Sequence, residues 1–359
     1  MDLVFFVLAL SVLILVHELG HFIAARKTGV RVEEFGLGLP PRIIGKKIKG
    51  TIFSLNWLPI GGFCRLYGED SDKKGGEAFN NKRPWQKMLI VLGGVLMNLV
   101  LAVVIFGAVY TIVGIPKEVD KVRIVGVSKN SPAMEAGLKE DDVILKVEDV
   151  EVKKADELIK EVEKYKGQKV KLIINNPPAG RAGEELKIYN KEIEVEVREN
   201  PPEGEGLMGV SISNTEMEPV AWYRVDKGII IGFKEAFYWG KIILNGVTSM
   251  LVGLISGNIP KDVSGPIGMY QATNSINKDQ GILAVIHFFG IVSVNLAVVN
   301  VLPFPALDGG RLIFVFYEMI TKKRVNQKIE SLVNNLGMFI LLSLIILVTI
   351  GDIRRVAGF

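Results

Sequence analysis

Cysteine and histidine are scarce in this 359-residue sequence, which contains one cysteine and three histidines. A single cysteine excludes an internal disulfide framework on either side of a membrane. That cysteine, Cys64, follows two glycines and a phenylalanine, a setting more typical of packing than of metal binding. The scarcity of histidine makes His17 and His21 informative, because two of the three histidines lie four residues apart.

Charged residues are nearly absent from four long stretches, which argues against a soluble globular protein. Hydrophobic residues make up 49% of the chain, and the mean hydropathy is +0.32. About 20 apolar residues are enough to cross a bilayer as a helix. The stretches of this length are Leu3–Ala25, Met88–Ile115, Ile282–Leu307 and Ser331–Gly351. The first resembles a signal peptide but lacks a basic start and a small-x-small cleavage site, so we predict that it is retained.

The charges between these stretches are distributed unevenly. Segment 26–87 holds 13 Lys and Arg against 6 Asp and Glu, whereas segment 115–227 holds 19 against 24. Short basic segments stay in the cytoplasm, so we expect segment 26–87 inside and segment 115–227 and both termini outside. We interpret a fifth apolar stretch, Gly228–Pro260, as an amphipathic helix on the outer surface. A further crossing there would place the basic 322–328 loop outside.

The first apolar stretch runs without a polar spacer into His17-Glu18-Leu19-Gly20-His21. On a helix, residues four apart lie on one face about 6 Å apart, so His17 and His21 can bind one metal ion. Glu18 lies beside them, where a carboxylate can take a proton from metal-bound water. The alternative is a chance match on a helix that faces a bundle interior. We favour the metal site, because ionisable residues in a membrane are costly and are usually functional.

A second candidate ligand lies at the end of the third stretch. The segment from Asn300 to Gly310 contains two prolines and two glycines around one carboxylate, Asp308. Irregular backbone at membrane depth occurs only where it is buried in protein or lines a polar cavity. Catalytic zinc sites keep three protein ligands and leave a fourth position for water, so Asp308 can complete the set with His17 and His21. The alternative role for Asp308 is to cap the following helix.

Segment 115–205 has the pattern of a globular module. We expect helices at Met134–Leu138 and Ala155–Tyr165, a turn followed by a strand over Asp141–Val147, and a loop at Asn175–Gly183. Further strands are expected at Val122–Val127, Val150–Val152, Val170–Ile174 and Ile188–Val197. Together with Ser131-Pro-Ala and Ala136-Gly-Leu, this order resembles a PDZ domain of the bacterial, circularly permuted type. PDZ domains bind a peptide C-terminus by adding it to a sheet edge. A module that only shields the membrane site is an equal alternative.

Taken together, the motifs resemble the site-2 protease family of intramembrane zinc metalloproteases, and the RseP-type bacterial branch is the best match. The resemblance rests on HELGH, on the NxxPxPxLDGG motif and on the PDZ-like module between them, and it covers essentially the whole chain. It implies Zn²⁺ as cofactor, with His17, His21 and Asp308 as ligands. It also implies that Glu18 is the general base.

The resemblance extends to further residues. Asn300 matches a family asparagine proposed to contact substrate, and its amide can donate a hydrogen bond to the scissile carbonyl oxygen or its oxyanion. Capping of the broken backbone is an equal alternative for this residue. Asn98 is a second candidate for substrate binding, in a Gly-Pro-x-x-Asn pattern whose proline is replaced here by Val95. Segment Glu33–Tyr67 is similar to the family's membrane-re-entrant β-hairpin, which can hold an extended substrate at a strand edge. One PDZ-like module is present where some relatives have two.

We therefore predict an α-helical polytopic membrane protein with four transmembrane helices, a re-entrant β-hairpin and an inserted α+β PDZ domain. The first two spans and the hairpin occupy residues 1–114, the PDZ domain 115–205, the interfacial helix region 206–260, and the last two spans 261–359. His287, in the third span, is expected to be a packed or interfacial residue.

The family implies cleavage of transmembrane segments of single-pass proteins, such as an anti-sigma factor, after a first protease has removed their outer domain. We expect a multi-pass protein of the bacterial cell membrane, with the PDZ domain outside, lipid contacts and no nucleic-acid partner. One alternative is an inactive, membrane-anchored PDZ adaptor, against which the intact HELGH and LDGG motifs count. A metal transporter is less consistent with the sequence, because the chain has no repeated halves.

Overall fold

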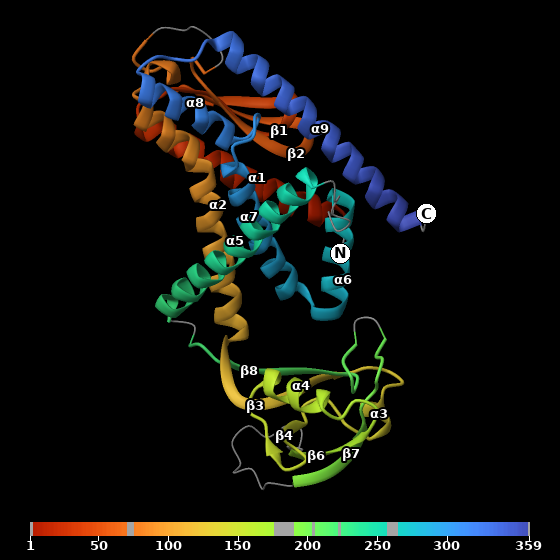
Figure 1. Ribbon diagram of the computed structural model, residues 1–359. Helices are drawn as coiled ribbons and strands as arrows, with labels where there is room; N and C mark the ends of the chain where they lie inside the picture. The colour runs from red at the N-terminus through yellow and green to blue at the C-terminus, as the bar shows by residue number, and fades with distance from the viewer. Residues whose placement is uncertain are drawn as a thin grey trace. The chain divides into compact units, whose positions relative to one another are not determined.

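The computed structural model describes residues 3–69, 75–175, 190–202, 205–221, 224–256 and 265–357. The chain forms two compact units, each with its own core. One unit comprises Met1–Ile112 together with Val220–Phe359, and the other is Val113–Pro219. Figure 1 shows the helices and the long hairpin of the first unit and the sheet of the second.

The first unit is built from helices, and the predicted apolar stretches account for most of them. Among the described residues, four helices are long and apolar enough to cross a membrane: α1 (Leu3–Lys27), α2 (Pro84–Val113), α7 (Ile282–Val301) and Gln327–Arg355 of α9 (Gln327–Ala357). The shorter helices are α6 (Pro266–Gln280), α8 (Asp308–Thr321) and the 3₁₀ turn η1 (Phe79–Asn81). The four predicted transmembrane stretches are thus confirmed as helices of sufficient length and hydropathy.

Apolar contacts hold α1 between its neighbours. Phe6 and Leu13 of α1 are buried against Val285 and Phe289 of α7, with partly buried side chains of α6 packed around them. By contrast, α9 leaves large apolar side chains such as Phe339 exposed along its length. Exposed apolar surface on a helix of this length suits contact with lipid tails.

Helix α5 (Val225–Ile255) includes most of the stretch Gly228–Pro260 that was predicted as an amphipathic helix, and it is not among the four candidate spans. Residues 257–260 of that stretch lie outside the described residues. It packs on α2 and α7 through a small polar cluster. His287 Nε2 lies 3.5 Å from Glu235 Oε1 and 3.4 Å from the Tyr110 hydroxyl oxygen. The Trp239 indole N–H donates to the same glutamate at 3.0 Å. His287 is therefore a packed residue, as predicted.

The segment predicted as a β-hairpin forms one. Strand β1 (Val32–Ile48) pairs antiparallel with β2 (Thr51–Leu66) through a turn at Lys49 and Gly50. The hairpin packs against α1, where the ring of Phe22 contacts the rings of Phe35 and Phe53 at centroid distances of 5.4 and 5.8 Å. These contacts bring β2 close to the helix that carries HELGH.

In its described residues, the second unit is an antiparallel sheet with two helices. Its strands lie in the order β7-β6-β4-β3-β8, and β5 pairs with β4. The elements are β3 (Ile115–Val127), α3 (Pro132–Glu135), β4 (Val143–Val147), β5 (Val150–Glu151), α4 (Ala155–Glu163), β6 (Lys169–Asn175), β7 (Asn190–Glu196) and β8 (Val210–Glu218). Each predicted strand and helix of the module corresponds to one of these, although residues 188 and 189 of the last predicted strand lie outside the described residues. Of the predicted loop only Asn175 is described, and it ends β6 instead of belonging to a loop.

The end of the second unit differs from the prediction. We expected the module to stop at residue 205, but β8 pairs with β3 along most of its length, from Val127↔Val210 to Ile115↔Glu218. The unit therefore extends to Pro219. The polar stretch of β8 carries weak local signals, and only the pairing with β3 makes it part of the sheet.

Candidate metal centre and active site

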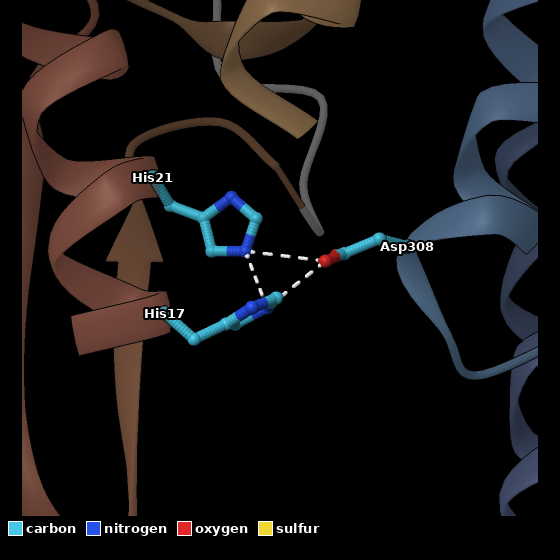
Figure 2. A group of neighbouring side chains, drawn as sticks. All are labelled: His17, His21 and Asp308. Atoms are coloured by element: carbon cyan, nitrogen blue, oxygen red, sulfur yellow. Dashed lines mark hydrogen bonds and ion pairs between the residues drawn. The ribbon is translucent and has the colours of Figure 1, made fainter. Parts of the chain in front are cut away.

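The two histidines of HELGH project from one face of α1, as their spacing requires. Their Nε2 atoms lie 3.1 Å apart, and the two rings meet edge to face. Figure 2 shows both rings directed toward Asp308. The His17 side chain is buried and that of His21 is nearly so, at 10% and 13% exposed. Two imidazoles so close together and shielded from water are arranged to share one cation.

Asp308 reaches this pair from α8. The carboxylate oxygen Oδ2 lies 3.0 Å from His17 Nε2 and 3.4 Å from His21 Nε2. Asp308 is the first residue of α8, and the structure shows no side-chain capping bond at the start of that helix. In the structure, Asp308 therefore does not have the alternative role of capping α8.

A tight turn between α7 and α8 makes this position possible. Helix α7 ends at Val301, and the chain passes through Pro303 and Pro305 before α8 begins. Gly309 then packs so closely on the end of α7 that a Cβ atom there would lie 2.0 Å from the Leu302 carbonyl oxygen. A side chain at 309 would push α8 away from α7 and move Asp308 with it.

The three residues form the one group of at least three candidate metal ligands among the described residues. Four ligands held at about 2.0–2.1 Å around zinc are about 3.3 Å apart. The three edges of the observed triangle are 3.0, 3.1 and 3.4 Å. Two imidazole nitrogens and one carboxylate oxygen are also typical zinc ligands with an open fourth position. The residues present therefore fit Zn²⁺.

Helix α2 contacts both histidines at their Nδ1 atoms. His21 Nδ1 lies 2.8 Å from the carbonyl oxygen of Ile90, and His17 Nδ1 lies 3.3 Å from the side-chain amide of Asn98. Between these two residues, Gly94 leaves room for the rings, since a Cβ atom there would lie 2.6 Å from His17 Cε1 and from His21 Nε2. Asn98 is fully buried.

A cavity of about 440 Å³ opens beside the cluster. Glu18 and Asn300 line it together with the three candidate ligands, whereas Asn98 is not among the lining residues. The structure thus places Glu18 of α1 and Asn300, near the end of α7, at the same cavity as the three candidate metal ligands. Asn98 lies on the far side of the His17 ring.

Strand β2 forms one wall of this cavity through Phe63 and Cys64. Gly62 lies next to the proposed base, because a Cβ atom there would be 3.6 Å from Glu18 Cγ. Burial raises the pKa of the Cys64 thiol, so this side chain stays neutral. The thiol is also absent from the ligand group, in agreement with the packing role expected for it.

Sequence reasoning did not identify an ion pair at the cavity. Arg311 and Glu69 both line it and form a salt bridge. Arg311 follows Asp308 by three residues and so lies on the same side of α8. That spacing places Arg311 near the site, but its acidic partner Glu69 follows the end of β2 by three residues and could not be identified from the sequence.

Comparison with known proteins decides the family. The family model for peptidase family M50 matches residues 5–344. The chain belongs to peptidase family M50, the site-2 protease family. Relatives of this M50 peptidase named "Putative zinc metalloprotease" occur in Clostridium acetobutylicum (33% identical, covering 98% of this chain and 97% of the relative) and Clostridium perfringens (33%, 98% and 98%). A third is found in Campylobacter jejuni (31%, 98% and 93%).

Family membership and the four apolar helices agree with each other. The M50 peptidase is a membrane metalloprotease with an inserted β-sheet unit. The HELGH helix α1 is itself one of the four candidate spans. The cluster of His17, His21 and Asp308 therefore lies on elements of the helical unit.

Proposed function

We propose that this M50 peptidase is a zinc endopeptidase that cleaves peptide bonds inside the transmembrane segments of single-pass membrane proteins. One observation carries the proposal: the ligand atoms of His17, His21 and Asp308 form a triangle with zinc dimensions, and both histidines lie with Glu18 on α1, a helix long and apolar enough to span a bilayer. Ionisable residues are rarely kept in such a helix without a function. His17, His21 and Asp308 would hold the zinc.

When bound, zinc acts as a Lewis acid and lowers the pKa of a coordinated water molecule toward 7. Glu18 lines the cavity beside the ligands, where its carboxylate can accept a proton from the attacking water. The same carboxyl group can then return that proton to the leaving amine. Asn300 faces the same cavity, where its amide can donate a hydrogen bond to the oxygen that becomes negative in the transition state.

A substrate helix must unwind before its peptide bond can react, because the helix buries that bond in its own hydrogen bonding. Strand β2 contributes Phe63 to the cavity wall next to Glu18. An extended substrate segment can add to the edge of such a hairpin through main-chain hydrogen bonds. We assign the hairpin this substrate-holding role.

Glu18→Gln tests the catalytic assignment. Loss of the general base should reduce cleavage of a purified transmembrane substrate by about 10²–10⁴-fold, while zinc stays bound because Glu18 is not a ligand. Glu69→Gln is the matched control, since Glu69 lines the same cavity but is paired with Arg311. Full activity of Glu18→Gln, or equal losses in both variants, would contradict the proposal.

The second unit carries features that suit peptide binding. A groove of about 400 Å³ lies between α4 and β8, lined by Leu158, Ile159 and Val162 of the helix and by Val210 and Ile212 of the strand. Strand β8 is at the end of the described strand order. An extended peptide C-terminus could pair with this strand and place an apolar side chain in the groove. We propose that the unit is a single PDZ domain and that the enzyme belongs to the RseP-type branch.

A fluorescently labelled peptide with an apolar, free C-terminus, titrated into the full-length enzyme, tests this binding. Ile159→Glu should weaken binding, because Ile159 is 50% exposed and its replacement puts a charge in the groove. Lys160→Glu, one residue further along the same helix and not a lining residue, is the control. Equal affinity of the amidated peptide would argue against recognition of the C-terminus.

The biological setting follows from the same assignment. We propose that the enzyme resides in the bacterial cell membrane with the PDZ domain outside. It would act in regulated intramembrane proteolysis, after a first protease has shortened the substrate. Its partners would be transmembrane protein substrates and the surrounding lipid.

A further inference from the structure

Helix α2 contacts both histidines at the ring nitrogens that face away from Asp308. His21 Nδ1 lies 2.8 Å from the Ile90 carbonyl oxygen, and His17 Nδ1 lies 3.3 Å from the Asn98 amide. The opposite nitrogens, both Nε2, lie 3.0 and 3.4 Å from Asp308 Oδ2. Each imidazole ring therefore lies between α2 on one side and Asp308 on the other.

The chemistry of these contacts determines where each ring carries its proton. A carbonyl oxygen can only accept, so His21 Nδ1 must be the donor in its contact with Ile90. The Nε2 atom of a neutral His21 then carries the lone pair that a metal ligand requires. His17 must have the same proton arrangement if it is to bind the same metal ion.

This requirement sets the orientation of the Asn98 amide. A half-turn of the amide presents either its nitrogen or its oxygen to His17 Nδ1. With the nitrogen toward His17, the Asn98 oxygen is buried and has no hydrogen-bond partner among the described residues. With the oxygen toward His17, it accepts the Nδ1–H proton. Only the second arrangement leaves the His17 Nε2 lone pair free.

We propose that Asn98 is a positioning residue that accepts a hydrogen bond from His17 Nδ1 and thereby prepares His17 Nε2 to bind zinc. The Ile90 carbonyl does the same for His21. Asn98 is 0% exposed and does not line the cavity, so this role takes the place of the substrate contact expected from the sequence. Ser293 on α7 donates to the Asn98 backbone carbonyl at 2.8 Å and fixes this part of α2.

Zinc affinity measured by chelator competition tests the proposal without any assay of cleavage. Asn98→Leu keeps the volume but removes the acceptor, and affinity should fall by about 10–100-fold. Asn98→Asp restores an acceptor for Nδ1–H, so zinc affinity should stay within about threefold of the natural protein, or rise. Thr273→Val is the control, since Thr273 is an equally buried polar residue on α6, away from the cluster.

The two variants separate positioning from packing. Equal losses in Asn98→Leu and Asn98→Asp, or unchanged affinity in Asn98→Leu, would overturn the proposal. If the leucine variant does not fold, the aspartate variant decides alone, because loss of tenfold or more in its zinc affinity contradicts the role. The inference rests on the proposed ligand set, which His17→Ala tests separately. Unchanged zinc affinity in His17→Ala would refute the ligand set itself.

Discussion

His17 Nε2 lies 3.0 Å from Asp308 Oδ2, although the two residues come from opposite ends of the chain. The first belongs to α1 and the second begins α8. The two residues come close because of the turn between α7 and α8 and because α1 and α8 both pack on α2. A site of this kind is sensitive to small changes in helix position, because zinc requires its ligands within a few tenths of an ångström.

Asp308→Asn should weaken zinc binding by more than about 100-fold, because the neutral amide is a poor zinc ligand and a direct ligand contributes more than its supporting residues. Asp352→Asn is the matched control. Asp352 is also buried, but its Oδ2 accepts from the backbone N–H groups of Gly265 and Gly268 at the start of α6. That variant should lower the melting temperature and keep its zinc. Tight zinc binding by Asp308→Asn would remove Asp308 from the ligand set.

Gly94→Ala should disturb the metal site without directly removing a ligand. The added methyl group would lie 2.6 Å from atoms of both His17 and His21, so the rings or α2 must shift, at a cost of about 1–3 kcal/mol. Zinc affinity and melting temperature should both fall. Gly246→Ala on α5 is the control, because a Cβ atom there meets nothing within 4 Å. Equal behaviour of the two variants would show that the packing at Gly94 is not important for zinc.

Asn300→Ala should lower kcat by about 10²–10³-fold, the usual cost of removing one donor to a developing oxyanion. Zinc content should stay at about one per chain, because the amide is not in the ligand group. Steady-state cleavage and metal analysis of the same sample check both statements. An increase in KM with unchanged kcat would instead indicate a role in ground-state binding.

Deletion of the second unit should leave the catalytic centre intact. Ile115 and Glu218 are paired across β3 and β8, so a short Gly-Ser linker can join residues 114 and 219. None of the cavity or cluster residues lies between them. Because domains fold separately, we expect bound zinc and cleavage of a bare transmembrane substrate within about tenfold of the intact enzyme. A folded, zinc-loaded variant without any cleavage would show that the unit is needed for catalysis.

The predicted topology can be tested with single cysteines in a Cys64→Ala background. A cysteine at Lys160 should react with a membrane-impermeant thiol reagent added to intact cells. A cysteine at Lys323, in the basic loop between α8 and α9, should be protected until the cells are opened. The opposite pattern would reverse the orientation.

The helices and the site chemistry could be predicted from the sequence because their signals are local. Unbroken apolar stretches specify helices of membrane length, as α1, α2, α7 and α9 show. The spacing of His17 and His21 specifies a common helix face, and the Pro-Gly-rich segment around Asp308 indicates a broken helix beside a polar site. The family resemblance added the hairpin, which the structure confirms as β1 and β2.

Other features depend on pairs of residues that no local pattern connects. The β8 strand joins the sheet only by pairing with β3, so the boundary of the second unit was misplaced. Arg311 of α8 and Glu69, three residues after the end of β2, meet at the cavity although they lie far apart in the sequence. The way in which α2 orients the two histidines is likewise visible only from the contact of His21 with Ile90 and that of His17 with Asn98.

The sequence by itself therefore determined which segments are helices of membrane length and which side chains can carry zinc chemistry, since both follow from neighbouring residues and their intrinsic properties. Only the tertiary structure decided how α2 holds the two histidines, which wall of the cavity β2 forms, and where the second unit ends. These depend on packing between distant segments, such as His21 and Ile90, which are 69 residues apart. Such packing is selected by the fit of whole helices and strands, and no single segment encodes it.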